Sequence, residues 1–380
     1  MSSIPRPDGG RLVSDIEGAL GALVASRWPG AELVSVTSVA PDRGTRGDRT
    51  DGGMGGSHSV RAVVRHAGGD VEDLVLRAAT PDDLGHDRRA DRAQRMLLSY
   101  DTFADVPGHA PAVDVGVVTG DGSLRPVGEG EYYLITRFVP GAPYADDLRR
   151  LASGEPLGAR DLARCDLLAE YLADLHRRPA ERPALYTRSI REVLGSDGGV
   201  FGIIDGFPEG APAAPPARLH ALERACAEWR WRLRGREHRG VRVHGDFQPL
   251  NILFDDHGVD GGAGELALVD ASRGARGDPA DDVCCLALYY VLFALSRPKV
   301  WEPAFRPLWK RFWERYLALS GDRELCDAAP LFVAWRALDF ASPVRHPKLG
   351  ERERDALLKL AERALAVSRF EPEWAEELFS

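Results

Sequence analysis

Strand-like and helix-like patterns occupy different parts of this chain of 380 residues. Alternating apolar and polar residues predict strands at 33–40, 59–66, 72–79 and 131–138. From Asp281 onward the spacing of apolar residues is mostly helical instead. A chain of this length suits two domains better than a single core. The sequence therefore predicts an α+β fold, with a sheet-rich N-terminal lobe over 1–138 and a mainly helical C-terminal lobe over 139–380.

The N-terminal lobe is expected to carry two helices beside its strands. Ser14 and Glu17 have the spacing of a capping box at the start of an apolar helical face. That face comprises Ile16, Ala19, Leu20, Leu23 and Val24. A second helix is expected over 87–100, and a hinge between the lobes near 136–145.

The C-terminal lobe has helical spacing at 162–176 and again at 217–233. The apolar run 283–295 predicts a buried helix that is too short to span a bilayer. Between these helices, 179–217 is rich in proline, glycine and alanine and predicts few periodic elements. Residues 179–240 together are expected to form an insertion in this lobe, on the side where a ligand binds.

Composition narrows the class of protein. Hydrophobic residues make up 44% and charged residues 28%, which is typical of a globular chain. The net charge of −9 argues against general binding of nucleic acid and is compatible with a cationic small ligand. The five cysteines are scattered without a CxxC pair, which disfavours zinc and disulfide frameworks. No signal peptide is apparent, so a cytoplasmic protein without membrane attachment is expected.

The stretch HGDFQPLN, 244–251, carries the strongest chemical pattern. Asp246 and Asn251 flank a loop that contains proline, and Asp270 ends the second of two short strands that follow. One carboxylate to orient a hydroxyl, with an amide oxygen and another carboxylate to hold Mg²⁺, is what phosphoryl transfer requires. These residue types in this order predict a phosphotransferase.

The segment HGDFQPLNILF…LVDASRGARGDPADDV resembles the signature of the aminoglycoside phosphotransferase family. That family has the protein-kinase-like fold and includes choline, fructosamine and homoserine kinases. The resemblance implies that Asp246 is the catalytic aspartate and that Asn251 and Asp270 ligate Mg²⁺. It also implies that His244 and Asp278 brace the loop. Asp281 or Asp282 is expected to cap the helix at 283.

Two positions in this segment depart from the pattern of the family. The protein-kinase DFG motif appears here as DAS, at 270–272. Gln248 stands where many relatives carry histidine, so a contact from this position to the acceptor stays open.

The nucleotide site is predicted in the N-terminal lobe by weaker patterns. The glycine-rich GGMGGSHS, 52–59, suits a flap over the phosphates, because backbone N–H groups approach closely where no Cβ intervenes. Its expected contacts are Gly55, Gly56 and Ser57. Arg77 takes the place of the phosphate-pairing lysine. Its acidic partner is expected to be Asp91, with Asp87 as the alternative.

Backbone groups of Thr136, Arg137 and Phe138 are expected to contact the base of the nucleotide. Because these are backbone contacts, the sequence does not distinguish ATP from GTP as the phosphate donor. The predicted enzyme transfers the γ-phosphate of ATP or GTP to a hydroxyl of a small molecule. A sugar-containing antibiotic of the aminoglycoside or another type is the leading acceptor, which makes antibiotic resistance the leading role. The sequence does not fix which hydroxyl is phosphorylated or whether the protein is a monomer or a dimer.

Three alternatives remain. The first is a metabolic kinase for choline, homoserine or a sugar. The second is a nucleotide-binding pseudokinase, suggested by Arg77 and Asp91 in place of lysine and glutamate. The third is nucleic-acid binding by the arginine cluster of 228–242. This cluster has two interpretations: an amphipathic helix with solvated arginines, or a clamp for an acidic or sugar-bearing acceptor. We favour the amphipathic helix.

Overall fold

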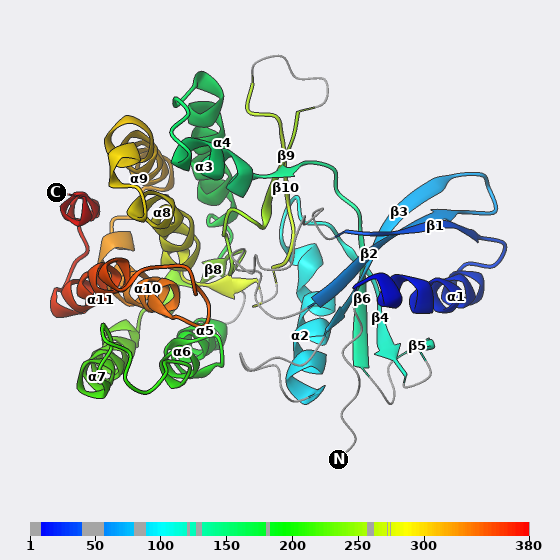
Figure 1. Ribbon diagram of the computed structural model, residues 1–380, viewed down its shortest axis with the longest axis horizontal. Coiled ribbons are helices and arrows are strands. Elements are labelled where there is room, and N and C mark those ends of the chain that lie inside the picture. Colours follow the sequence, from blue (N-terminus) through cyan, green and yellow to red (C-terminus); the bar gives the residue numbers. More distant parts are fainter. Residues whose placement is uncertain are drawn as a thin grey trace. The chain divides into compact units, whose positions relative to one another are not determined.

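The computed structural model of the protein describes 9–39, 57–79, 89–119, 122–126, 131–179, 183–256, 262–271, 273 and 275–379. The chain divides into two compact units, shown with their elements in Figure 1. Unit 1 comprises Met1–Ala104 and Ala110–Val139, and unit 2 comprises Asp105–His109 and Pro140–Ser380. Unit 1 is rich in sheet and unit 2 is mainly helical, so the α+β class is confirmed.

Unit 1 is built on a six-stranded antiparallel sheet with the strand order β1-β2-β3-β6-β4-β5. The strands are β1 (Glu32–Ser38), β2 (Ser57–Arg65), β3 (Val71–Ala79), β4 (Ala112–Val118), β5 (Leu124–Pro126) and β6 (Glu131–Arg137). Helix α1 (Gly9–Arg27) packs against β1 and β2, and α2 (Arg89–Thr102) packs against β4 and β6. Apolar side chains of α1 and the sheet, among them Leu20 and Val64, form one buried core.

Two details of unit 1 differ from the expectation. Helix α1 is already formed at Gly9, so Ser14 lies inside it and is not its N-cap. Strands β4 and β5 were not expected, because glycine interrupts the apolar run of β4. Gly116 is required there, since a Cβ at this position would lie 2.3 Å from the ring of Tyr133 on β6.

Unit 2 contains nine α-helices within its described residues. They are α3 (Tyr144–Ala152), α4 (Ala159–Leu175), α5 (Pro183–Gly195), α6 (Val200–Asp205), α7 (Pro216–Leu233), α8 (Pro279–Leu295), α9 (Arg306–Ser320), α10 (Leu325–Ala341) and α11 (Glu351–Ala366). Helices α8 and α10 are buried along nearly their whole length and pack against each other. A helix that is apolar all round belongs in the core of a large domain, so α8 and α10 form the centre of unit 2.

The region 179–217 contains two helices that the sequence did not predict. Tyr186, Ile190 and Val193 of α5 are buried, as are Val200 and Ile203 of the short α6. Proline and glycine mark the ends of these helices instead of preventing them: Pro183 begins α5, Gly195 ends it, and Gly199 precedes α6. In the next helix, α7, Trp229 is buried whereas Trp231 is 61% exposed.

Short strands of unit 2 surround the HGDFQPLN loop. Strands β10 (Glu265–Leu268), β9 (Ile252–Asp255) and β7 (Ala142–Pro143) form one small sheet, in that order. Strands β8 (Val241–Arg242) and β11 (Arg276–Gly277) form another. The loop therefore runs from the end of β8 to the start of β9. Among the described residues, no helix is long and apolar enough to cross a membrane.

Candidate active site

Asp246 is at the centre of a polar network in this loop. Its side chain is buried, and each of its carboxylate oxygens accepts hydrogen bonds. Oδ2 accepts from Nε2 of Gln248 at 2.7 Å and from Nδ2 of Asn251 at 3.1 Å. Oδ1 accepts from Nη1 of Arg336 at 3.2 Å. Donors on both oxygens fix the rotamer of this carboxylate.

Gln248 is held in turn by Tyr289 of α8. The Tyr289 hydroxyl donates to Oε1 of Gln248 at 2.8 Å. Burial raises the pKa of Tyr289 well above its ordinary value, so the phenol stays protonated and acts as a donor. This bond directs the Gln248 side-chain N–H toward Asp246. Gln248 is therefore held against the aspartate, and a contact from this position to the acceptor stays open.

Asn251 and Asp270 lie at the same end of the β9–β10 hairpin. Ile252 pairs with Leu268, and the Val269 N–H donates to the Asn251 carbonyl at 3.0 Å, which extends the ladder by one step. Asp270 follows directly, with a φ of 65°. It is the one non-glycine residue with positive φ in the described part of the chain. Such a conformation is uncommon outside glycine and is retained mainly at functional sites.

His109 supports the same strand end. It belongs to the short segment Asp105–His109, which is part of unit 2 although the residues before and after it belong to unit 1. Its Nε2 accepts from the Ala271 N–H at 3.2 Å, and the residue forms an isolated bridge with Leu268. The residues on both sides of Asp270 are therefore fixed by main-chain hydrogen bonds.

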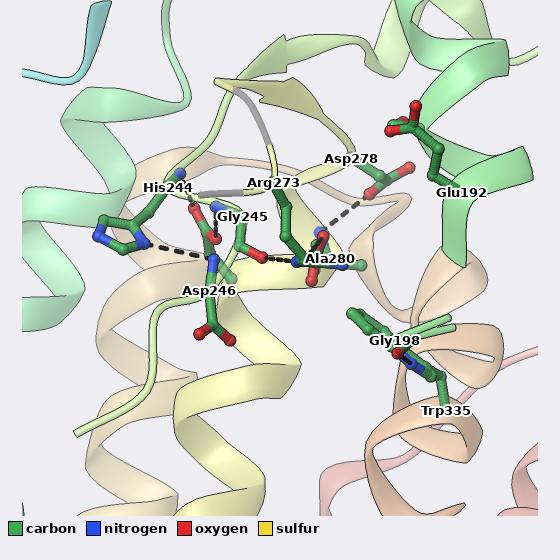
Figure 2. A network of polar contacts seen from close by, with 12 residues as sticks. Glu192, Gly198, His244, Gly245, Asp246, Arg273, Asp278, Ala280 and Trp335 are labelled. Atoms are coloured by element: carbon green, nitrogen blue, oxygen red, sulfur yellow. Dashed lines mark hydrogen bonds and ion pairs between the residues drawn. The ribbon is translucent and has the colours of Figure 1, made fainter. Parts of the chain in front are cut away.

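His244 contacts both Asp246 in the loop and Asp282 of α8. Its Nδ1 accepts from the Asp246 N–H at 3.3 Å (Figure 2). Burial lowers the pKa of His244, against the opposing effect of the Asp282 carboxylate and its neighbours, so the ring is neutral at pH 7. The His244 and Gly245 N–H groups donate to Asp282 at 2.7 and 2.8 Å. Asp282 thus holds the main chain that leads into Asp246.

The acidic residues at the start of α8 have different roles from those expected. Asp278, not Asp281 or Asp282, is the N-cap of α8, and its carboxylate accepts from the Ala280 N–H at 2.9 Å. Its two oxygens also accept from Arg239 at 2.8 Å each. The carboxylate that braces the loop is Asp282. Burial alone would raise the pKa of Asp282, but the hydrogen bonds from His176 and from the His244 N–H hold it below its ordinary value.

Arg273 extends the network on the other side of the loop. Its Nε donates to the Gly245 carbonyl, and its Nη2 pairs with Asp281 of α8. Asp281 also accepts from Arg336 at 3.4 Å. The loop is therefore bound to α8 through Asp281 and Asp282, and to α10 through Arg336.

The residues expected to bind nucleotide belong to unit 1, whereas the network around Asp246 belongs to unit 2. Arg77 is half-buried on β3, opposite Leu134 of β6. The N–H groups of Arg137 and Phe138 donate to the carbonyls of Pro111 and Asp73 within the sheet, which engages both N–H groups inside unit 1. Thr136 is a buried residue of β6.

The other predicted nucleotide contacts are described only in part. Gly55, Gly56 and Asp87 lie outside the described residues. Ser57 begins β2 and Asp91 lies in the first turn of α2, with only the backbone of each described. Whether Asp91 or Asp87 pairs with Arg77 stays a prediction.

Comparison with known proteins identifies the family of this chain. The model of the phosphotransferase enzyme family matches residues 54–326, which is more than half of the chain. The chain belongs to this family. It is accordingly a small-molecule kinase, as the sequence pattern predicted. No curated protein matches the chain in sequence.

Solved structures with detectable similarity include three small-molecule kinases. Aminoglycoside phosphotransferase APH(3'')-Id from Streptomyces rimosus has 22% identity and covers 75% of this chain and 93% of its own, with a TM-score of 0.42. The GDP and kanamycin complex of APH(2")-IIia has 15% identity, coverages of 91% and 97%, and a TM-score of 0.46. Ethanolamine kinase of Plasmodium vivax has 12% identity, coverages of 92% and 83%, and a TM-score of 0.46.

Arg273 and Arg336 are among the residues of the network that the sequence analysis missed, as are Tyr289 and His109. Arg273 follows the DAS motif directly, and Arg336 lies in the mostly apolar stretch LFVAWRALDFA of α10, whose other charged residue is Asp339. A single arginine in a helix that is buried all round must have a buried acidic partner. That pattern predicts a partner for Arg336, although it does not identify Asp246.

Proposed function

We propose that this family member transfers the γ-phosphoryl group of ATP or GTP to a hydroxyl of a small molecule, with Asp246 as the catalytic residue. The observation that supports this most directly is the Asp246 carboxylate, which is buried and fixed by three side-chain donors. Phosphoryl transfer depends mainly on positioning and on charge stabilisation, and a carboxylate held this rigidly suits the first of these.

The reaction is an in-line displacement at the γ-phosphorus. A bond forms between the acceptor oxygen and phosphorus, and the bond to the nucleoside diphosphate breaks. Asp246 accepts a hydrogen bond from the acceptor hydroxyl, orients its oxygen, and takes up the proton as transfer proceeds. In unit 1, Arg77 and the glycine-rich segment at 52–59 are the proposed phosphate contacts.

The residues that would hold Mg²⁺ fit a hard cation. The Asn251 side-chain N–H₂ group donates twice to Asp246, which leaves Oδ1 of that amide as the oxygen for a metal. Asp270 supplies a carboxylate from the adjacent strand end. Oxygen donors of these two types are typical of magnesium sites in kinases. When bound, the cation neutralises charge on the phosphates.

For the acceptor we propose a sugar-containing antibiotic, on the basis of the resemblance of 244–282 to aminoglycoside phosphotransferases. The net charge of −9 is compatible with a cationic acceptor of this kind. The second candidate is a metabolic amino alcohol or sugar. It is supported by the breadth of the family, to which choline and homoserine kinases belong by the same resemblance. In either case the protein acts in the cytoplasm.

A crossed screen tests this function. The protein is incubated with Mg²⁺ and ATP or GTP, and with aminoglycosides, spectinomycin, glucosamine, ethanolamine, choline or homoserine one at a time. We expect one acceptor to gain the mass of a single phosphoryl group, and the same acceptor with nucleotide to raise the melting temperature. If no acceptor is modified and neither nucleotide binds, the proposal is wrong and the pseudokinase alternative gains support.

The Asn251→Ala variant tests the metal site. We expect the Mg²⁺ concentration for half-maximal activity to rise at least about tenfold, since even the outer partners of metal ligands contribute about 10- to 100-fold. Initial rates over a Mg²⁺ titration measure this. Gln248→Ala serves as the control, because it removes a different donor to Asp246 without removing a proposed ligand. An unchanged Mg²⁺ requirement in Asn251→Ala would exclude this residue as a ligand.

A further inference from the structure

Arg336 on α10 is a buried arginine in direct contact with the proposed catalytic carboxylate. Its side chain is 5% exposed, and its Nη1 lies 3.2 Å from Oδ1 of Asp246. The two residues are 90 positions apart in the chain. Arg336 also lies beyond residue 326, where the match to the family model ends. The family pattern therefore does not account for this contact.

The two oxygens of Asp246 are unequally occupied. Oδ2 accepts from two side chains, Gln248 and Asn251, whereas within the described residues Oδ1 accepts from Arg336 alone. A carboxylate oxygen has lone pairs for about two hydrogen bonds. Oδ1 is therefore the oxygen with capacity for the acceptor hydroxyl, and Arg336 is bound to that same atom.

Charge balance explains how an arginine can be buried here. Arg336 and Arg273 share Asp281, and Arg336 also pairs with Asp246, so two cations face two carboxylates. Trp335 supports the two guanidinium groups, which lie over its ring at 4.1 Å and 4.4 Å from the centroid. Its indole N–H donates to the Gly198 carbonyl at 3.0 Å, as Figure 2 shows for Trp335 and Gly198.

The geometry of Arg336 is not that of the strongest ion pair. Its contacts with Asp246 and Asp281 are single hydrogen bonds of 3.2 and 3.4 Å, not a two-point pair with one carboxylate. Its Nε is buried without a hydrogen-bond partner among the described residues. A buried charge that is incompletely paired is a poor source of stability. Its retention is better explained by an effect on Asp246.

We propose that Arg336 is a positioning residue that fixes Oδ1 of Asp246 toward the acceptor hydroxyl. This inference rests on the proposed function, because it concerns the reaction of Asp246. Arg336 touches neither the acceptor nor the nucleotide in this role. Its loss lowers the rate of transfer and leaves the binding of nucleotide unchanged.

The test measures release of ADP or GDP in the presence of Mg²⁺, with water as the acceptor. Arg336→Met is expected to lower kcat about 10- to 100-fold, since small misplacements of catalytic groups have effects of this size. The KM for nucleotide is expected to stay within about twofold of the wild-type value. The kcat of Arg336→Lys is expected to lie between those of the wild-type protein and Arg336→Met, because lysine retains the charge but cannot bridge both carboxylates.

A double variant separates positioning from a general structural effect. If Arg336 acts only through Asp246, then Asp246→Ala combined with Arg336→Met loses no more activity than Asp246→Ala alone. A multiplicative loss in the double variant would overturn the proposal. So would a wild-type kcat in Arg336→Met. If the wild-type protein turns over neither nucleotide with water or any acceptor of the screen, the proposed function itself fails, and this inference fails with it.

Two further variants keep the test independent of folding. In Arg336→Met with Asp281→Asn, one cation and one carboxylate are removed together, so charge balance is restored. We expect its melting temperature to recover while its kcat stays low. The matched control is Arg354→Met, which removes an equally buried arginine whose donors bond the carbonyls of Ala341 and His346. It is expected to lose stability and to keep its kcat.

Discussion

Asp246→Ala is expected to lower the rate of phosphoryl transfer about 10²- to 10⁴-fold, the range in which a positioned acid or base contributes. The loss should appear in kcat, because Asp246 is proposed to act on the hydroxyl during transfer and not on the bound nucleotide. Initial rates with the acceptor found in the screen measure it. The KM for nucleotide should change little.

Folding must be checked in the same variant, because removal of Asp246 leaves Arg336 with one carboxylate partner instead of two. Asp246→Asn retains the volume of the side chain and separates the two effects. The matched control is Asp161→Asn on α4, a buried aspartate that pairs with Arg150 outside the loop. An Asp246→Asn variant that is folded and fully active would refute the assigned role.

The part of the site that was predictable from sequence depends on short-range structure. Asp246 and Asn251 belong to one loop, and a two-stranded hairpin returns the chain to Asp270. Contacts between neighbouring elements of this kind follow from the order of residues and from strand pairing alone. The family pattern in the same segment then assigns a chemistry to them. Proximity in sequence is what made this constellation visible.

The parts that were not predictable depend on contacts between distant segments. Asp282 braces the main chain at His244 across 38 positions, and Arg336 meets Asp246 across 90. The cap at Asp278 was missed for a local reason, because three aspartates lie within 278–282 and the sequence analysis assigned the cap to Asp281 or Asp282. Asp278 is the cap because Pro279 is the first residue of the helix. Asp282 lies in the first turn and is buried.

The N-terminal nucleotide contacts illustrate a different limit. The position of Arg77 on β3 follows from strand order. Its role depends on which other residues lie near its side chain, and the sequence does not identify them. Backbone groups of Thr136, Arg137 and Phe138 were expected to contact the base, and the N–H groups of Arg137 and Phe138 donate to carbonyls within unit 1. Backbone contacts carry no residue code, so the sequence could not distinguish these two uses.

Asp278→Ala is expected to cause the largest loss of stability, about 3–5 kcal/mol in the free energy of unfolding. The Asp278 side chain is fully buried, accepts from Tyr186 at 3.1 Å, and pairs with the buried Arg239 through both oxygens. Its removal leaves Arg239 with Asp322 and Glu324, which are both more exposed, as its acidic partners among the described residues. The midpoint of urea unfolding, at unchanged slope, measures the loss.

Asp278→Asn is the matched variant for this prediction. Asparagine caps helices as well as aspartate does, so the bond to the Ala280 N–H should remain while the charge is lost. If the ion pair with Arg239 dominates, the two variants should lose similar stability; if the cap dominates, asparagine should restore most of it. A loss below about 1 kcal/mol in Asp278→Ala would contradict both contributions. Because Asp281 and Asp282 lie in the turn that Asp278 caps, activity should fall with temperature earlier in the alanine variant than in the wild-type protein.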